Sequence, residues 1–402
     1  GFALFFLLFA SYFMLRPVRE TFGIAGGIDN LHWLFLGTFI ATLVVVPIYG
    51  MASARLPRAT LLPASYIFSA VVMAGFAISL LVDPDNVWAA RAFYIWLSVF
   101  NLFVISLAWS LMADIFDTDQ GRRLFGQIAA GASLGGLAGP LLSGLLVGSL
   151  GHGGLLLLST LLLLATLVPA RFLLGWRARH GHPADHSAPA RPIGGSMWAG
   201  LTLILRSPYL LSISAFVILL TAVSTFLYFE QARIVEATFA DRASQTRAFS
   251  AIDVVVQSLT ILIQVFLTGR LARRLGVTVL LTAVPLAMTL GFGILALAAT
   301  FPVLVGVMIV RRVGEYALIR PGREMLFTAV DAETKYKAKN AIDTVVYRGG
   351  DAIAAWANAG IAALGGAAAA AVVGGMIALA WAGLGGMIGR RHDRTLSSTP
   401  QQ

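Results

Sequence analysis

Long apolar runs, separated by short polar or glycine-rich connections, make up most of the chain. A helix needs about 20 largely apolar residues to cross the hydrocarbon core of a bilayer, and twelve runs approach that length. The expected spans cover residues 1–16, 31–52, 60–82, 87–113, 124–149, 153–175, 208–229, 249–268, 277–299, 301–319, 340–364 and 366–389. The pattern therefore predicts an all-α membrane protein with twelve transmembrane helices in two six-helix bundles.

The composition agrees with a membrane protein and limits the kinds of reactive site that the chain can contain. Of the 402 residues, 58% are hydrophobic and 12% are charged, whereas soluble domains carry about 25% charged residues. The chain has no cysteine, which excludes disulfides, thiol catalysis and thiolate metal sites. It begins with Gly1 inside an apolar run and without a basic region, so we expect a natural N-terminus further upstream rather than a signal peptide.

Positive charge predicts the orientation, because Lys and Arg are retained in cytoplasmic loops. We interpret the net charge of +10 in this way rather than as a nucleic-acid-binding signal. With a cytoplasmic N-terminus, the inside loops and the tail hold Arg55, Arg58, Arg122, Arg123, Arg177, Arg179, Arg191, Arg270, Arg273, Arg274, Lys335, Lys337, Lys339, Arg390, Arg391 and Arg394. Outside connections lack Lys and Arg, except after spans 1 and 7. We therefore expect a multi-pass protein of the bacterial inner membrane with both termini cytoplasmic.

A polar linker divides the chain into two halves of six spans. Residues 176–197 are rich in Pro, Gly, Ala and Ser, a composition typical of a flexible linker. Its histidines are interpreted as solvated residues rather than metal ligands: His180, His182 and His186. We expect one bundle at residues 1–175, a cytoplasmic linker, and a second bundle with a short cytoplasmic tail at residues 198–402.

The two halves repeat two loop patterns. The loop "GMASARLPR" (Gly50 to Arg58) follows span 2, and "GRLARRLG" (Gly269 to Gly276) follows span 8. After spans 4 and 10 an acidic stretch precedes a basic one, in "ADIFDTDQGRRLFG" and "TAVDAETKYKAKNAID". Repeated halves of this kind predict a transporter with a substrate site at the interface of the halves, near the middle of the membrane.

The Gly-and-Arg loops resemble the signature loop of the major facilitator superfamily. Where that family usually has an Asp before the first Arg, this chain has Ala54, which weakens the family's charge relay. In span 5, Gly131, Gly135 and Gly139 recur every four residues and Pro140 follows. This pattern resembles the superfamily's antiporter signature, and it fits equally well with close packing of a neighbouring helix on small residues.

Ionisable side chains interrupt the apolar spans, and such groups usually line a cavity or pathway. Most fall on spans 1, 4, 7 and 10, which would surround the cavity of a 6+6 transporter. Within span 10, Arg312, Glu315 and Arg323 lie close to one helical face, with Tyr316 adjacent. We expect Pro321–Gly322 to break that helix and expose backbone groups that can bind a ligand.

Arginine suits planar, bidentate recognition of phosphate or carboxylate, so the charged spans predict an anionic ligand. The candidate substrate-binding residues are Arg16, Arg19, Glu230, Arg312, Glu315, Tyr316, Arg320, Arg323, Lys339, Asp343 and Arg348. The alternative for each of them is an ion pair that only locks helices together. We expect no cofactor and no metal site.

Three segments resemble the ATP/ADP translocase family of obligate intracellular bacteria and plastids. They are "LRPVRET" from Leu15, "WSLMADIFDTDQGRRLFG" from Trp109, and "RPGREMLFTAVDAETKYKAKNAIDTVVYR" from Arg320. The resemblance implies nucleotide exchange in which Arg19 and Lys339 are the important basic residues and Glu230 is the acidic residue of helix 7. The family's acid in helix 4 has no counterpart here.

These features predict a secondary transporter of an organic anion, such as a nucleotide or other phosphorylated metabolite, that works by alternating access and exchange. A proton-coupled exporter of drugs or siderophores from the major facilitator superfamily is the alternative, and a flippase for a lipid phosphate stays open. An enzyme is not expected, because the chain has no Cys, no Ser/His/Asp set and no P-loop. The expected partners are a small anionic solute and the lipid bilayer, without nucleic acid, and the expected state is a monomer.

Overall fold

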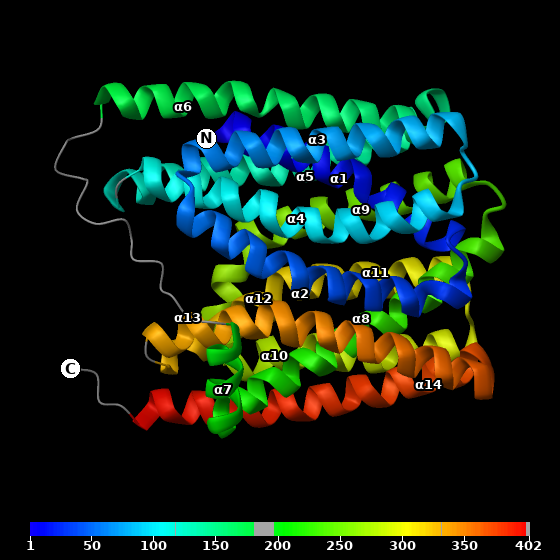
Figure 1. Ribbon diagram of the computed structural model, residues 1–402. Helices are drawn as coiled ribbons and strands as arrows, with labels where there is room; N and C mark the ends of the chain where they lie inside the picture. Colours follow the sequence, from blue (N-terminus) through cyan, green and yellow to red (C-terminus); the bar gives the residue numbers. More distant parts are fainter. Residues whose placement is uncertain (117, 181–196, 331, 399–402) are drawn as a thin grey trace. The chain divides into compact units, whose positions relative to one another are not determined.

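A computed structural model describes the chain except residues 117, 181–196, 331 and 399–402. Every regular element in the described part is a helix, which confirms the all-α fold class (Figure 1). The α-helices are α1 (Phe2–Ala25), α2 (Leu31–Arg55), α3 (Arg58–Val82), α4 (Val87–Ile115), α5 (Thr118–Ala165), α6 (Leu167–His180), α7 (Met197–Arg206), α8 (Pro208–Thr238), α9 (Arg242–Ile263), α10 (Gly269–Leu297), α11 (Phe301–Gly314), α12 (Arg320–Leu326), α13 (Ala332–Ala341) and α14 (Tyr347–Ser398). Short 3-10 turns are η1 (Ile28–Asn30) and η5 (Phe327–Ala329), and π-helical turns are η3 (Gln264–Thr268), η4 (Glu315–Ile319) and η6 (Ile342–Val346).

Nine helices of the described part are long and apolar enough to cross a membrane. Two of them, Arg123–Arg177 and Lys337–Asp393, hold 55 and 57 residues, or roughly 80 Å of helix at the usual rise per residue. Each bends at a glycine in the left-handed region, Gly151 (φ 64°) and Gly366 (φ 75°), where the sequence predicts a boundary between two spans. Each is therefore long enough for two crossings of a core of about 30 Å, while the full count of twelve stays a prediction.

The first span extends further than the sequence suggests. We expected it to end at residue 16, but α1 continues to Ala25, so Arg16, Arg19 and Glu20 lie inside the helix. Pro17 sits within α1 without ending it. The charges are tolerated there because each is paired with a polar side chain. The seventh span is longer in the same way, since α8 continues past Glu230 to Thr238.

The helix break expected at Pro321–Gly322 is wrong. The chain stays helical from Phe301 to Leu326, and the irregularity is the π turn η4 just before the proline. There the Arg320 N–H bonds the Glu315 carbonyl, five residues back. A proline has no N–H to donate, and its ring crowds the preceding turn. The wider π turn before Pro321 makes room for the ring, and the helix continues without the missing hydrogen bond.

The chain forms two compact units. Unit 1 comprises Gly1–Ile28, Ile40–Pro192 and Phe239–Gln257, and unit 2 comprises Asp29–Phe39, Ile193–Thr238 and Ser258–Gln402. Each unit thus takes a short segment from the opposite half of the sequence. The predicted linker at residues 176–197 lies mostly outside the described residues, so the expected domain boundary stays a prediction.

Small residues let helix backbones approach closely inside unit 1. A Cβ added to Gly131 would lie 2.5 Å from the Phe2 carbonyl oxygen of α1, and one added to Gly139 would lie 2.7 Å from the Met14 nitrogen. Real Cβ atoms essentially never come that near to another backbone. The structure therefore confirms that the glycines of α5 serve close packing, here against α1.

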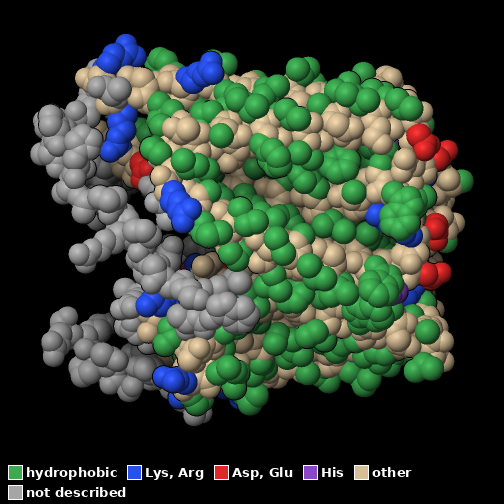
Figure 2. All heavy atoms as spheres, in the orientation of Figure 1, with side chains coloured by type: hydrophobic (Ala, Val, Ile, Leu, Met, Phe, Trp, Pro, Cys, Tyr) green, Lys and Arg blue, Asp and Glu red, His purple; other side chains and the backbone are tan. Residues whose placement is uncertain are grey.

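In unit 2, glycines of α14 likewise let its backbone approach that of α10 closely. A Cβ on Gly389 would lie 2.5 Å from Thr278 Cα, and one on Gly385 would lie 2.7 Å from the Leu281 carbonyl oxygen. The indole of Trp381, which is 2% exposed, packs on Phe216 with ring centroids 5.5 Å apart. Apolar side chains spread over the face seen in Figure 2, as expected where lipid is the solvent.

Candidate functional site

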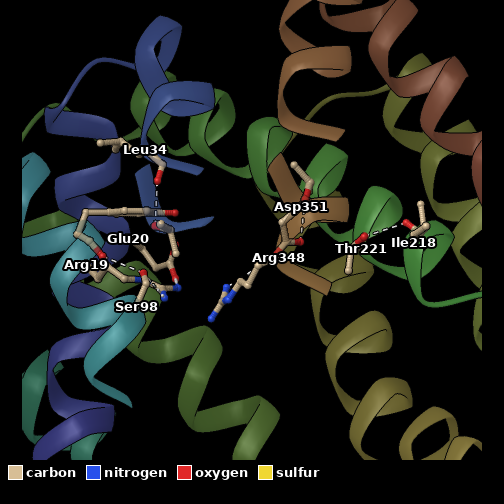
Figure 3. Close-up of polar contacts among 11 residues, drawn as sticks. Arg19, Glu20, Leu34, Ser98, Ile218, Thr221, Arg348 and Asp351 are labelled. Carbon is tan, nitrogen blue, oxygen red and sulfur yellow. Dashed lines mark hydrogen bonds and ion pairs between the residues drawn. The ribbon is translucent and has the colours of Figure 1, made fainter. Parts of the chain in front are cut away.

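A polar cluster in unit 1 centres on Arg19 of α1. Its guanidinium donates to Ser98 Oγ of α4 at 3.4 Å and pairs with the Glu20 carboxylate (Figure 3). The same guanidinium lies over the Tyr94 ring, 5.4 Å from the centroid. α1 and α4 bring these groups together because their apolar faces pack in one core. We call Arg19, Glu20, Tyr94 and Ser98 the unit 1 cluster.

A second charge of α1, Arg16, lies near a carboxylate from the segment that the second half contributes to unit 1. Arg16 Nε lies 3.9 Å from Asp253 Oδ2 on α9. Asp253 is 3% exposed. The structure therefore accounts for Arg16 by an ion pair across helices of unit 1, whereas the Arg19 guanidinium reaches a hydroxyl of α4.

A polar cluster in unit 2 centres on Arg311 of α11. Its Nη1 donates to Ser224 Oγ of α8 and to Glu315 Oε2, both at 2.9 Å. A second guanidinium, that of Arg320, has its Nη2 3.8 Å from Glu315 Oε1. The Cζ of Arg320 lies 4.5 Å from the centroid of the Tyr316 ring. We call these five residues the unit 2 cluster.

The π turn η4 explains why Arg323 does not share the expected helical face with Glu315. The sequence placed Arg312, Glu315 and Arg323 together, but Glu315 pairs with Arg311, and Arg323 pairs with Asp343 at 2.9 Å. Arg312 is 4% exposed in α11. A π turn adds a residue per turn and rotates everything after it, so a spacing of eight residues no longer returns to the same face. π turns recur at functional sites.

The remaining candidates form separate ion pairs in unit 2. Lys339 Nζ lies 2.6 Å from the Glu324 carboxylate, which makes this partly exposed pair the shortest of them. Arg348 Nη1 lies 3.5 Å from Asp351 Oδ2 on the same helix. Arg233 Nη1 lies 3.2 Å from Glu230 Oε2, and its Nη2 donates to Asn358 at 3.3 Å.

The two clusters share a donor set. In each unit one arginine bridges a carboxylate and a serine hydroxyl, and the serine comes from a different helix. The helices also correspond, because α1 and α4 are expected spans 1 and 4, and α8 and α11 are expected spans 7 and 10. Sequence reasoning placed Arg311 in span 10 but missed its role, although its spacing of four residues from Glu315 was a usable signal.

The arrangement favours recognition of an oxyanion rather than bond-breaking chemistry. Guanidinium and hydroxyl donors next to aromatic rings can hold phosphate or carboxylate oxygens. Among the described residues no three His, Cys, Asp or Glu side chains gather in a way that could hold a metal ion. The linker histidines lie outside the residues whose side chains are described.

Comparison with known families decides the class of protein. A sequence model of the Major Facilitator Superfamily matches residues 1–321. The chain belongs to the Major Facilitator Superfamily. This superfamily member is thus a multi-pass transport protein of the alternating-access type and not an enzyme, which confirms the resemblance seen in its Gly-and-Arg loops.

One relative of this superfamily member is an ADP,ATP carrier. It is similar to the ADP,ATP carrier protein 1 of Chlamydia muridarum (strain MoPn / Nigg), with 25% identity over 300 residues that cover 65% of this chain and 56% of the carrier. The matched region thus spans little more than half of that carrier.

Solved transporter structures share the fold of this superfamily member. The POT family transporter PepTSo is 14% identical with a TM-score of 0.69, over 98% of this chain and 97% of the other. A bacterial homologue of the iron transporter ferroportin, in an inward-facing state, is 15% identical with a TM-score of 0.63, over 94% and 96%. At these identities the likeness shows the fold and not the cargo.

Proposed function

We propose that this transporter moves an organic anion, a nucleotide or other phosphorylated metabolite, by exchange. The observation that carries the proposal is the pair of arginine-centred clusters, one in each unit. A partly buried arginine is costly in a bilayer. In unit 1, Arg19 lies against a serine hydroxyl and an aromatic ring. In unit 2, Arg311 bonds the serine hydroxyl while Arg320 lies over the aromatic ring. These groups favour an oxyanion as the ligand that compensates the arginine.

The similarity to an ADP,ATP carrier supports a phosphorylated cargo. The residues that we propose to contact cargo are those of the two clusters together with the other candidates, Arg16, Glu230, Arg312, Arg323, Lys339, Asp343 and Arg348. When cargo is absent, the neighbouring carboxylates pair with the arginines. The basic residues of alternate loops support a bacterial inner-membrane protein with both termini cytoplasmic.

Uptake of labelled ADP into proteoliposomes preloaded with unlabelled ADP tests this function. We expect exchange by the wild type, strong loss in Arg19→Ala, and partial retention in Arg19→Lys, since lysine keeps the charge but not the planar fork. Arg179→Ala is the matched control, because Arg179 is exposed at the end of α6. Equal exchange by wild-type and Arg19→Ala vesicles would contradict the proposal.

A further inference from the structure

The short helix α7 lies where the chain enters the membrane-spanning helix α8. α7 has ten residues, or about 15 Å of helix, which is about half the thickness of the hydrocarbon core. Only Ser207 separates α7 from Pro208, the first residue of the candidate span Pro208–Thr238. Figure 1 shows α7 directed across the long helices of unit 2 rather than along them. These features place α7 at the surface of the membrane and not across its core.

One face of α7 is fixed to the basic helix α13. A Cβ on Gly200 would lie 2.5 Å from the Lys337 carbonyl oxygen and 2.8 Å from Ala341 Cβ, so the two backbones are in contact. Ile204, one helical turn after Gly200, is 3% exposed. α7 is therefore a packed element of unit 2, and its position relative to α13 is set.

The stripe of α7 beside this contact is apolar and uncovered. It consists of Leu201 and Leu205, each one position after a buried residue. Leu205 is 75% exposed, which is comparable with Leu290 of the spanning helix α10 at 71%. Lipid is the solvent for such leucines on a spanning helix. Because α7 adjoins the membrane, we assign the same solvent to Leu205.

Basic side chains surround the apolar stripe. Arg206 ends α7 and is exposed. Lys335 and Lys337 belong to α13, the helix that α7 contacts. The charge of Arg391, near the end of α14, acts on Tyr209 in the first turn of α8. Four cations thus lie on the elements of unit 2 that meet at α7.

The carboxylates at this end of unit 2 are engaged elsewhere. Glu324 lies 2.6 Å from Lys339, and Asp393 accepts a hydrogen bond from the Thr278 hydroxyl at 2.7 Å. Within the part of the chain that the structure describes, no carboxylate forms an ion pair with Arg206. The positive charge beside α7 is therefore available to an anion outside the protein.

We propose that α7 and α13 form a docking site for an anionic phospholipid. Leu201 and Leu205 contact the acyl chains, and Arg206 with the lysines of α13 binds the headgroup phosphate. Amphipathic helices with basic residues on the polar side lie in membrane interfaces in this way, and anionic headgroups attract Lys and Arg near the surface. Because the site is independent of the cargo, it stands or fails apart from the proposed function.

A fluorescent label at position 205 tests whether the stripe lies in lipid. The chain has no cysteine, so Leu205→Cys gives one attachment point for an NBD label in the full chain. In phosphatidylcholine vesicles that contain phosphatidylglycerol, a nitroxide on the lipid acyl chain should quench the label, and aqueous iodide should not. The same label on Arg179→Cys, exposed at the end of α6, should show the opposite pattern. Iodide quenching at position 205 as strong as at position 179 would overturn the docking site.

Binding of phosphatidylglycerol tests the headgroup contact. Native mass spectrometry of the full chain, titrated with this lipid in detergent, gives an apparent Kd for the first lipid bound. One basic residue near an anionic membrane surface contributes about fivefold in affinity. Arg206→Gln should therefore weaken the Kd about fivefold, and Arg206→Lys should keep most of the affinity. Arg179→Gln, a change of the same kind away from α7, should bind like the wild type.

Three results of the titration would overturn the site. Equal weakening in Arg206→Gln and Arg179→Gln would show general charge attraction instead of a site. Equal affinity of the wild type for phosphatidylglycerol and phosphatidylcholine would show that the headgroup charge contributes nothing. A loss in Arg206→Lys as large as that in Arg206→Gln would show that positive charge at this position is not what binds the lipid.

Discussion

The close packing of α5 on α1 gives a prediction that can be worked from the structure. Gly135 of α5 has no side chain, and a Cβ there would lie 3.0 Å from both the Ala10 nitrogen and the Phe6 carbonyl carbon, and closer still to the Phe6 carbonyl oxygen. The obstructing atoms belong to backbone, so no rotamer change can relieve the contact. We predict that Gly135→Ala forces the two helices apart and destabilises the protein.

The expected magnitude comes from two opposing effects. Overpacking a tight interior costs about 1–3 kcal/mol. Alanine in place of glycine in a helix gains about 1 kcal/mol of helix propensity. The same substitution at Gly126, also in α5, meets nothing within 4 Å and keeps the gain without the clash. The free energies of unfolding of the two variants should therefore differ by about 1–3 kcal/mol, with Gly126→Ala the more stable.

Thermal unfolding followed by tryptophan fluorescence in one detergent is the assay. The expected order of midpoints is Gly135→Ala below the wild type, and Gly126→Ala at or above the wild type. Gly135→Ile should unfold at a lower temperature still. If Gly135→Ala and Gly126→Ala unfold together, the helices are not in the close contact described and the reasoning is wrong.

Three further variants test local features. Asp241 caps α9, and hydrogen bonds from the hydroxyl and N–H of Ser244 lower the pKa of its carboxyl. Asp241→Ala should therefore lower the melting midpoint at neutral pH. The difference from the wild type should vanish as the pH falls through that lowered pKa. Gly366 has a φ of 75°, so Gly366→Ala should lower the free energy of unfolding by about 1–2 kcal/mol. Gly360→Ala is the control and should not destabilise the protein, because a Cβ there meets open space. Equal melting midpoints for the two variants would contradict a left-handed bend. Lys339 and Glu324 form a partly exposed pair, so a double-mutant cycle of unfolding should find a coupling of only about 0.2–1 kcal/mol, and a larger value would assign the pair a structural role.

The helices and the class of protein were predictable because they follow from local patterns. Apolar runs of membrane length, positive loops and a repeated Gly-and-Arg loop are each readable without tertiary structure. The same holds for the glycines of α5, whose four-residue spacing predicts a close helix contact. The bends at Gly151 and Gly366 fall where the sequence placed boundaries between spans.

The partners of the buried charges were not predictable, because they depend on packing between distant segments. Nothing near Arg19 in sequence indicates that Ser98 is its acceptor, and the contact of Arg16 with Asp253 joins opposite halves of the chain. The π turn that begins at Glu315 changes the helical register after it, which is why Arg323 pairs with Asp343 instead of sharing a face with Glu315. A π turn before a proline leaves no separate mark in the sequence.

The central claim is that the partly buried arginines of the two clusters are present because an anionic cargo compensates them. Calorimetric titration of the purified protein with ADP tests it most directly, with wild type, Arg19→Gln and Arg311→Gln compared in one detergent. Loss of one hydrogen bond to a charged group is worth about 1.5–3 kcal/mol, or roughly a 10- to 100-fold weaker Kd. We predict this weakening of the Kd for ADP in both variants. We also predict that the wild type does not bind a neutral dipeptide. ADP affinity unchanged in both variants would contradict the claim.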